Sequence, residues 1–148
     1  MSSKPQIAYV TIRVFSHATE DPAKVQTAVK NTLPETLTEN LVFEKTALTG
    51  HYGNPITICE AKLTNRTALT QALEKIGSQL NSLDKEQLCS EMQQHIEKRN
   101  LYLRFDKQSA YLGSLKLGTV DPIHFKIHFR NKTPEEIAEI CQKAGLTP

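Results

Sequence analysis

The segment spanning residues 100–113, NLYLRFDKQSAYLG, combines aromatic, basic and amide side chains at regular spacing. Tyr102 and Arg104 fall on one side of a strand with period-2 alternation, and Lys107 and Gln108 follow directly. Nucleic-acid bases stack on aromatic rings, and a guanidinium binds phosphate oxygens through two parallel hydrogen bonds. The pattern favours a ligand that carries bases and phosphates. An ordinary solvated strand face is the alternative.

Two other predicted strands present similar outward side chains. Tyr9 and Arg13 alternate with apolar residues near the N-terminus, and Lys126, His128 and Arg130 do so near the C-terminus. If these strands are neighbours of the first segment in a sheet, the side chains form one basic patch. Such a patch would bind RNA by phosphate contacts and stacking, with an affinity that falls as salt rises. The alternative is that the residues are scattered or that helices cover this face.

The turn sequence GHYGNP at residues 50–55 projects several hydrogen-bonding side chains. Its two glycines allow a tight turn, from which His51, Tyr52 and Asn54 would extend. These side chains could contact a nucleotide. A plain hairpin connection is the alternative, because turns are polar in general.

The sequence SHATED at residues 16–21 contains the pair His17 and Thr19, which matches half of a two-histidine phosphoesterase signature. That chemistry needs a second H-x-T or H-x-S, with one histidine as base and the other as acid, and the sequence contains none. Carboxylates at a helix start usually cap the helix and interact with its dipole. We therefore expect no catalytic residue, no cofactor and no metal, although a metal site is conceivable from His17, Glu20, Asp21 and His51.

Composition sets wider limits. The chain has 148 residues, 39% of them hydrophobic, which suits a single domain over residues 1–148. A net charge of +2 and a pI near 8.4 permit RNA binding without indicating it. Three widely spaced cysteines predict buried free thiols. The sequence has no long apolar run and MSSKPQ lacks a hydrophobic signal region, so we expect a soluble cytoplasmic protein without membrane contact.

The elements that would position these residues follow from hydrophobic periodicity and capping signals. We expect strands at 6–15, 41–49, 56–63, 101–106 and 123–130, and helices at 22–32, 65–80, 84–96 and about 133–145. Asn65, Asp84 and Thr133 are the expected N-caps of the last three helices. The order β-α-β-β-α-α-β-β-α predicts an α+β fold in which helices cover one face of a mostly antiparallel sheet. The opposite face would then be free.

Three motifs together resemble an archaeal family described as predicted RNA-binding proteins associated with the exosome. They are HATED at 17–21, GHYGNPI at 50–56 and LYLRFDKQSAYLG at 101–113, and the resemblance extends over about residues 7–129. It implies a fold like that of the large-subunit ribosomal protein that binds 5S RNA. It also places His17, the turn at 50–54, Arg104, Lys107 and Gln108 in the family motifs, without assigning a catalytic role to any of them.

Three functions remain open from the sequence. The favoured one is a non-catalytic RNA-binding protein that assists RNA processing or degradation, with subunits of an RNA-degrading complex as partners. Tyr102, Arg104, Lys107 and the turn at 50–55 would then lie at the contact surface. The second is a protein-interaction module, including a homodimer, that uses the open sheet face, because interfaces favour aromatic residues and arginine. The third is a phosphoesterase that uses His17.

Overall fold

Strands with alternating apolar residues form the centre of the protein. In the computed structural model, which describes residues 7–39, 41–50 and 52–148, six strands pair in the order β2-β3-β1-β6-β5-β4. All neighbouring strands are antiparallel. The strands are β1 (Ile7–His17), β2 (Glu44–Thr49), β3 (Pro55–Leu63), β4 (Ile96–Glu97), β5 (Asn100–Phe105) and β6 (Ile123–Phe129).

One face of this sheet carries the hydrophobic core. Alternate residues of the central strands are buried on it, among them Ile12, Leu103 and Phe125. Phe105 and Phe125 pack edge to face, with ring centroids 5.1 Å apart. Each such side chain contributes roughly 1.5–3 kcal/mol by leaving water, so the alternation fixes which face of the sheet is covered.

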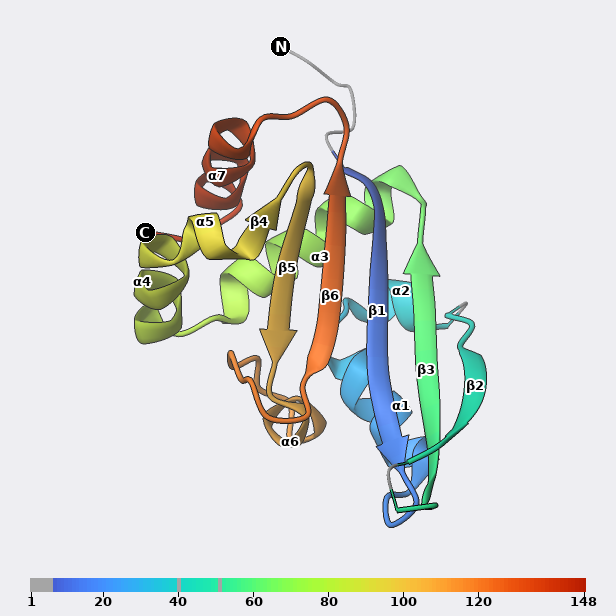
Figure 1. Cartoon of the computed structure of the whole chain (residues 1–148). Coiled ribbons are helices and arrows are strands. Elements are labelled where there is room, and N and C mark those ends of the chain that lie inside the picture. The colour runs from blue at the N-terminus through green and yellow to red at the C-terminus, as the bar shows by residue number, and fades with distance from the viewer. Residues whose placement is uncertain (1–6, 40, 51) are drawn as a thin grey trace.

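Helices pack on that face and along one edge of the sheet, as the sequence predicts. In Figure 1, α1 and α3 lie behind the sheet, whereas β1, β6 and β5 face the viewer with no helix in front of them. The fold is therefore a single α+β domain with an open antiparallel sheet. The helices are α1 (Pro22–Asn31), α2 (Glu35–Thr38), α3 (Arg66–Gln79), α4 (Ser82–Ser90), α5 (Met92–His95), α6 (Lys107–Tyr111) and α7 (Pro134–Lys143).

The expected helix caps are confirmed at two positions and wrong at one. Asn65 caps α3, and Thr133 forms the predicted capping box of α7 with Glu136. Helix α4, which corresponds to the third predicted helix, starts earlier than expected, because Asn81 is its N-cap and accepts a hydrogen bond from the backbone N–H of Asp84 at 2.8 Å. Asp84 instead accepts a hydrogen bond from the backbone N–H of Leu117, 2.9 Å away. It thereby ties α4 to the loop that precedes β6.

Four short elements add to the predicted order: α2, α5, β4 and α6. Of these, α6 matters for the site, because it follows β5 directly and carries Lys107. Its cap is Asp106, whose carboxylate accepts hydrogen bonds from the backbone N–H of Ser109 at 2.9 Å and from its hydroxyl at 2.6 Å. The strand therefore ends at Phe105, and the residues after it turn away from the sheet.

Two of the three cysteines are buried as predicted, and the third is exposed, contrary to the prediction. Cys59 and Cys141 are buried free thiols as predicted, and burial raises the pKa of Cys141 to about 12. Cys89 is exposed, because it lies on the outer side of α4. Among the residues that the structure describes, no helix has the length and apolarity needed to cross a bilayer.

Candidate functional site

Three strands bring basic side chains into one row on the open face. Arg13 of β1 and Arg104 of β5 are both in register with His124 of β6. Both arginines are exposed, whereas His124 between them is half-buried. The row exists because β1, β6 and β5 are neighbours in the sheet, although they lie far apart in the sequence.

A second row lies beside the first and adds a lysine. Lys126 of β6 is flanked in register by Thr11 of β1 and Tyr102 of β5. The second row is displaced from the first by two residues along each strand, so the side chains of both rows point to the same face of the sheet. The predicted convergence of Arg13, Tyr102, Arg104 and Lys126 is therefore a feature of the structure.

A third row contains a stack of two rings. Tyr9 and His128 have ring centroids 4.9 Å apart at an interplanar angle of 19°, and the Nδ1 atom of His128 lies 2.8 Å from Oδ1 of Asn100. Lys62 of β3 places its ammonium 4.7 Å from the centre of the Tyr9 ring. Tyr9 is thus held between a lysine from one neighbouring strand and a histidine from the other. We name the residues of the three rows the basic face: Tyr9, Thr11, Arg13, Lys62, Asn100, Tyr102, Arg104, His124, Lys126 and His128.

Burial and the positive charge of the basic face lower the pKa values of its two histidines. Burial, together with the charges of Arg104 and Arg13, lowers the pKa of His124. Burial, together with the charges of Lys126 and Arg99, lowers the pKa of His128. The surrounding positive charge thus disfavours a further proton. Glu60 moderates the charge at one end, where it pairs with Arg13 at 3.6 Å, with both side chains substantially exposed.

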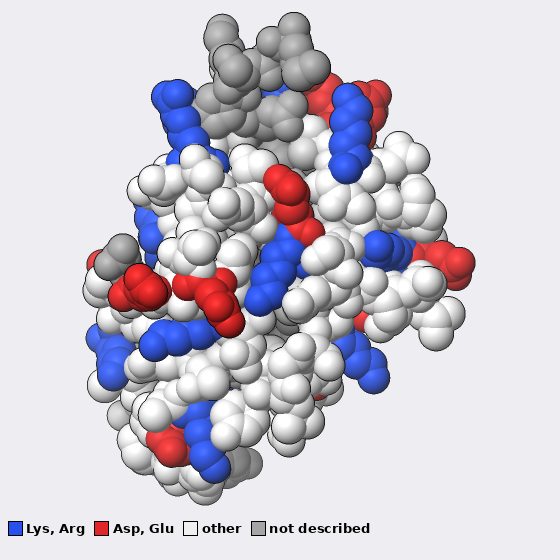
Figure 2. Space-filling view, turned by 180° about the vertical axis from the view of Figure 1, so that it is seen from behind, with Lys and Arg blue, Asp and Glu red and all other residues white. Residues whose placement is uncertain are grey.

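The opposite, helix-covered side of the protein has a different charge pattern. Figure 2 shows it from behind, with acidic and basic side chains interspersed over the described surface. Mixed signs at short range cancel within about a Debye length, roughly 8 Å at physiological salt. The helix-covered side therefore offers a weaker field to an anionic ligand than the basic face does.

Lys107 lies away from the basic face, contrary to the expectation that it extends the patch. It follows the end of β5, and its ammonium lies 2.7 Å from Asp121 and 3.0 Å from both carboxylate oxygens of Glu20. It also donates to the backbone carbonyl of Phe15 at 2.9 Å. Its side chain is only 11% exposed. Lys107 therefore joins the end of β1, the start of α1 and the loop before β6.

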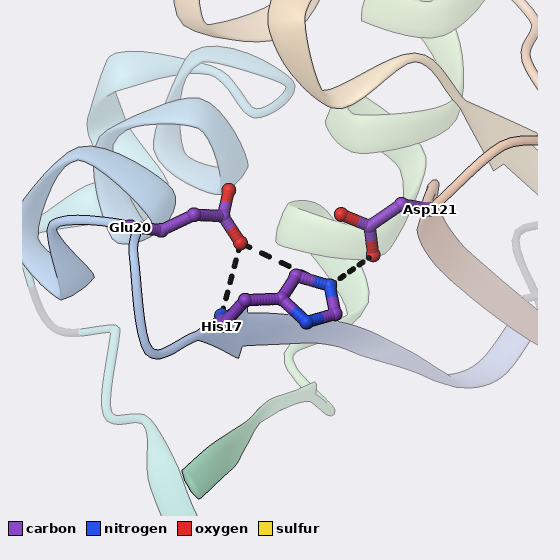
Figure 3. A group of neighbouring side chains, drawn as sticks. All are labelled: His17, Glu20 and Asp121. Carbon is purple, nitrogen blue, oxygen red and sulfur yellow. Dashed lines mark hydrogen bonds and ion pairs between the residues drawn. The ribbon is translucent and has the colours of Figure 1, made fainter. Parts of the chain in front are cut away.

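The same cluster brings together ligand types that metal ions use. Figure 3 shows His17 between Glu20 and Asp121, with Nε2 of His17 3.1 Å from Asp121. The candidate ligand atoms of these three residues lie within 4.8 Å of one another. The ammonium of Lys107 already balances both carboxylates. Burial opposes ionisation of Asp121, but hydrogen bonds from Lys107 and His17 outweigh it and lower its pKa.

This arrangement corrects the conceivable metal site. Asp21 is the N-cap of α1 and accepts a hydrogen bond from the backbone N–H of Ala23, 3.0 Å away, whereas Asp121 completes the cluster. His51 lies outside the described residues. The contacts of HATED thus join the end of β1 to the start of α1 and to Asp121.

The remaining predicted site residues are dispersed. Tyr52 and Asn54 are exposed in the turn between β2 and β3, where the backbone N–H of Gly50 donates to the carbonyl of Asn54. Gln108 lines a pocket of about 540 Å³ beside the Lys107 cluster. Arg130 is exposed just past the end of β6. None of these four belongs to the three rows of the basic face.

Sequence reasoning missed some members of both groups. His124 is an outward residue of the predicted strand at 123–130, like Lys126 and His128, but it was not included among the predicted site residues. Lys62 lies in the predicted strand at 56–63, where the period-2 pattern that found Arg13 could have found it. Asp121 had no local signal, because it meets Lys107 and His17 only through the tertiary fold.

Comparisons with known proteins identify the family and the fold. A family model described as RNA binding matches residues 9–129. The RNA-binding protein PAB1135 of Pyrococcus abyssi is 35% identical over 130 residues, which cover 86% of this chain and 84% of that protein.

Solved structures give the same fold. Mth689, a DUF54 protein from Methanothermobacter thermautotrophicus, has a TM-score of 0.78 and 28% identity and covers 95% of this chain and 98% of its own. For SSO0741 from Sulfolobus solfataricus the TM-score is 0.70, the identity 29% and the coverage 91% and 98%. These relatives come from archaea.

Proposed function

The chain belongs to the RNA-binding family whose model matches residues 9–129, and from this premise we propose that it is a non-catalytic RNA-binding protein that binds through the basic face. Lysine and arginine side chains supply most of the affinity for a nucleic-acid backbone, because they release condensed counterions from the phosphates. The basic face offers them on neighbouring strands, where a phosphate backbone can reach several at once.

The observation that carries the proposal is the row formed by Arg13, His124 and Arg104. The two arginines carry like charges on either side of β6, and burial together with their charge disfavours protonation of His124 between them. A protein gains from such a row when a negatively charged ligand neutralises it. Phosphate oxygens suit arginine well, because the guanidinium can donate two parallel hydrogen bonds to them.

The more specific role, as an accessory to RNA processing or degradation, is supported by the resemblance of the three sequence motifs to the exosome-associated family. Subunits of an RNA-degrading complex are the proposed protein partners, and the cytoplasm is the proposed location. The likeness of the fold to the 5S-RNA-binding ribosomal protein stays a prediction. A homodimer through the basic face is the weaker alternative, because a symmetric contact would bring two sets of arginines together and desolvate them.

The test is the salt dependence of RNA binding. Fluorescence anisotropy with a labelled single-stranded RNA and a labelled hairpin would give dissociation constants between about 50 and 200 mM salt. We expect wild type to bind both more tightly at low salt. The double variant Arg13→Gln with Arg104→Gln should bind more weakly, and its slope of log K against log salt should be shallower by about 1.4 for the single strand.

A matched control removes one lysine and one arginine from the helix-covered side. Lys30 in α1 and Arg66 in α3 are both exposed, so Lys30→Gln with Arg66→Gln changes the net charge equally. This control should keep the wild-type slope. An equal loss in both double variants would mean that net charge alone drives binding and would contradict a site on the basic face. Absence of binding at low salt would contradict the function itself.

A further inference from the structure

A pocket of about 430 Å³ opens at the β5 edge of the basic face, between that strand, α4, α5 and the loop before β6. We name it the β5-edge pocket. Two of its residues, Tyr102 and Arg104, also belong to the basic face, so the pocket and the face form one continuous surface. The volume lies within the range of small-molecule sites, roughly 300–1,000 Å³. The lining of the pocket also includes Gln87, Glu91, Gln94 and His95.

Tyr102 offers an aromatic surface to this pocket. Its ring stacks on His124, with centroids 5.7 Å apart. His124 belongs to β6, which lies on one side of β5, whereas the pocket lies on the other side. His124 therefore stacks against the ring from one side of β5, and Tyr102 lines the pocket on the other side of that strand. Tyr9 differs, because its ring already has two partners, Lys62 from β3 and His128 from β6.

The polar residues of the pocket match the edge of a nucleobase. Gln87 and Gln94 each carry an amide that can donate and accept hydrogen bonds, and both side chains are exposed. His95 is held in place, since its Nδ1 lies 3.0 Å from the backbone carbonyl of Tyr102 and its Nε2 lies 3.7 Å from Glu91. A carbonyl can only accept, so Nδ1 carries the proton. The contact thus ties the His95 ring to β5.

From these contacts we propose that the β5-edge pocket binds one unpaired nucleobase of an RNA whose backbone lies on the basic face. The base stacks on Tyr102, its edge meets the amides of Gln87 and Gln94, and Arg104 binds the adjoining phosphate. A base inside a continuous duplex cannot enter a pocket of this kind, whereas a base in a loop, bulge or single strand can. The inference rests on the proposed function and specifies its substrate class as RNA with at least one unpaired base.

The test compares three RNAs of related sequence: a fully paired duplex, the same duplex with a one-nucleotide bulge, and one of its single strands. Stacking of one base on an aromatic side chain contributes about tenfold or more to affinity. We expect wild type to bind the bulged duplex and the single strand at least about tenfold more tightly than the paired duplex. Tyr102→Leu and the double variant Gln87→Ala with Gln94→Ala should lose this advantage and keep their affinity for the paired duplex.

The control double variant is Gln79→Ala with Gln93→Ala. Both glutamines are exposed, and Gln93 adjoins Gln94 in α5 but lines a different pocket. This control variant should keep the wild-type preference for the bulged duplex and the single strand over the paired duplex. Equal affinity for paired and bulged duplexes, or a preference that survives both pocket variants, would overturn this inference and leave the proposed function intact. Failure to bind any of the three RNAs at low salt would overturn the proposed function, and the inference with it.

Discussion

Arg13 of β1 and Arg104 of β5 lie in one row of the open sheet face, on either side of His124, with which both are in register. Neighbouring strands are about 4.8 Å apart, so the two arginine backbones are separated by about 10 Å. His124 between them is partly removed from water. Burial, together with the charges of both arginines, lowers the pKa of this central histidine.

The first prediction concerns the pKa of His124 and the pH dependence of RNA binding. Burial and the two arginines lower the pKa of His124 in the free protein, and a bound phosphate should raise it. The complex then holds more protons than the free protein, so RNA affinity should increase as the pH falls from about 7.5 through the ordinary histidine pKa of 6.5. His128 should behave in the same way, because its pKa is also lowered.

NMR titration of the histidine ring protons, with and without RNA, would measure these pKa values. His124→Gln should bind RNA with a weaker pH dependence than wild type. Unchanged pKa values of His124 and His128 in the presence of saturating RNA would show that the phosphates bind elsewhere.

The second prediction concerns Lys107. Lys107→Met retains the aliphatic stem but leaves the carboxylates of Glu20 and Asp121 without their shared cation. We expect the free energy of unfolding to fall by about 2 kcal/mol at pH 7, the scale of charged hydrogen bonds at a mostly buried group. Urea denaturation would show this as a lower midpoint with an unchanged slope.

Acid should reduce the difference in the free energy of unfolding between wild type and Lys107→Met. The pKa of Asp121 is lowered in the folded protein, so its stabilising effect is present above the ordinary value of 3.8 and is lost as the pH falls through the lowered pKa. The gap between wild type and Lys107→Met should therefore narrow below about pH 4. Lys116→Met, at an exposed position of the loop after α6, should change stability by less than about 0.5 kcal/mol. A stable Lys107→Met protein that cannot bind RNA would instead place Lys107 at the ligand.

The third prediction concerns the contact between α3 and the end of α7. Gly77 is buried in α3, and a Cβ at this position would overlap the backbone carbonyl of Ala144. Alanine favours helix by about 1 kcal/mol over glycine, yet we expect Gly77→Ala to lower stability by about 2 kcal/mol, because the backbone must move apart. Thermal or urea denaturation would measure the change, and Ser78→Ala on the exposed side of α3 should be nearly neutral. A stabilised Gly77→Ala protein would contradict this packing.

The sequence predicted much of the fold because hydrophobic periodicity is a local property. Leu101, Leu103 and Phe105 alternate in β5 and are fully buried, and the same pattern holds for Ile123, Phe125 and Ile127 in β6. The pattern also specified which side chains would point away from the core. Short elements such as α6 were missed, because a single capping carboxylate at Asp106 determines where the strand ends.

By itself, the sequence determined the α+β class, the five longer strands and the outward direction of Tyr9, Arg13, Tyr102 and Arg104. Only the tertiary structure decided that β6 lies between β1 and β5, which places Arg13 and Arg104 around one histidine. It also separated Arg104 from Lys107, three residues later, by giving Lys107 to Glu20 and Asp121. The physical reason is that alternation specifies the face of a strand, whereas strand order and ion pairing depend on contacts between residues far apart in the chain.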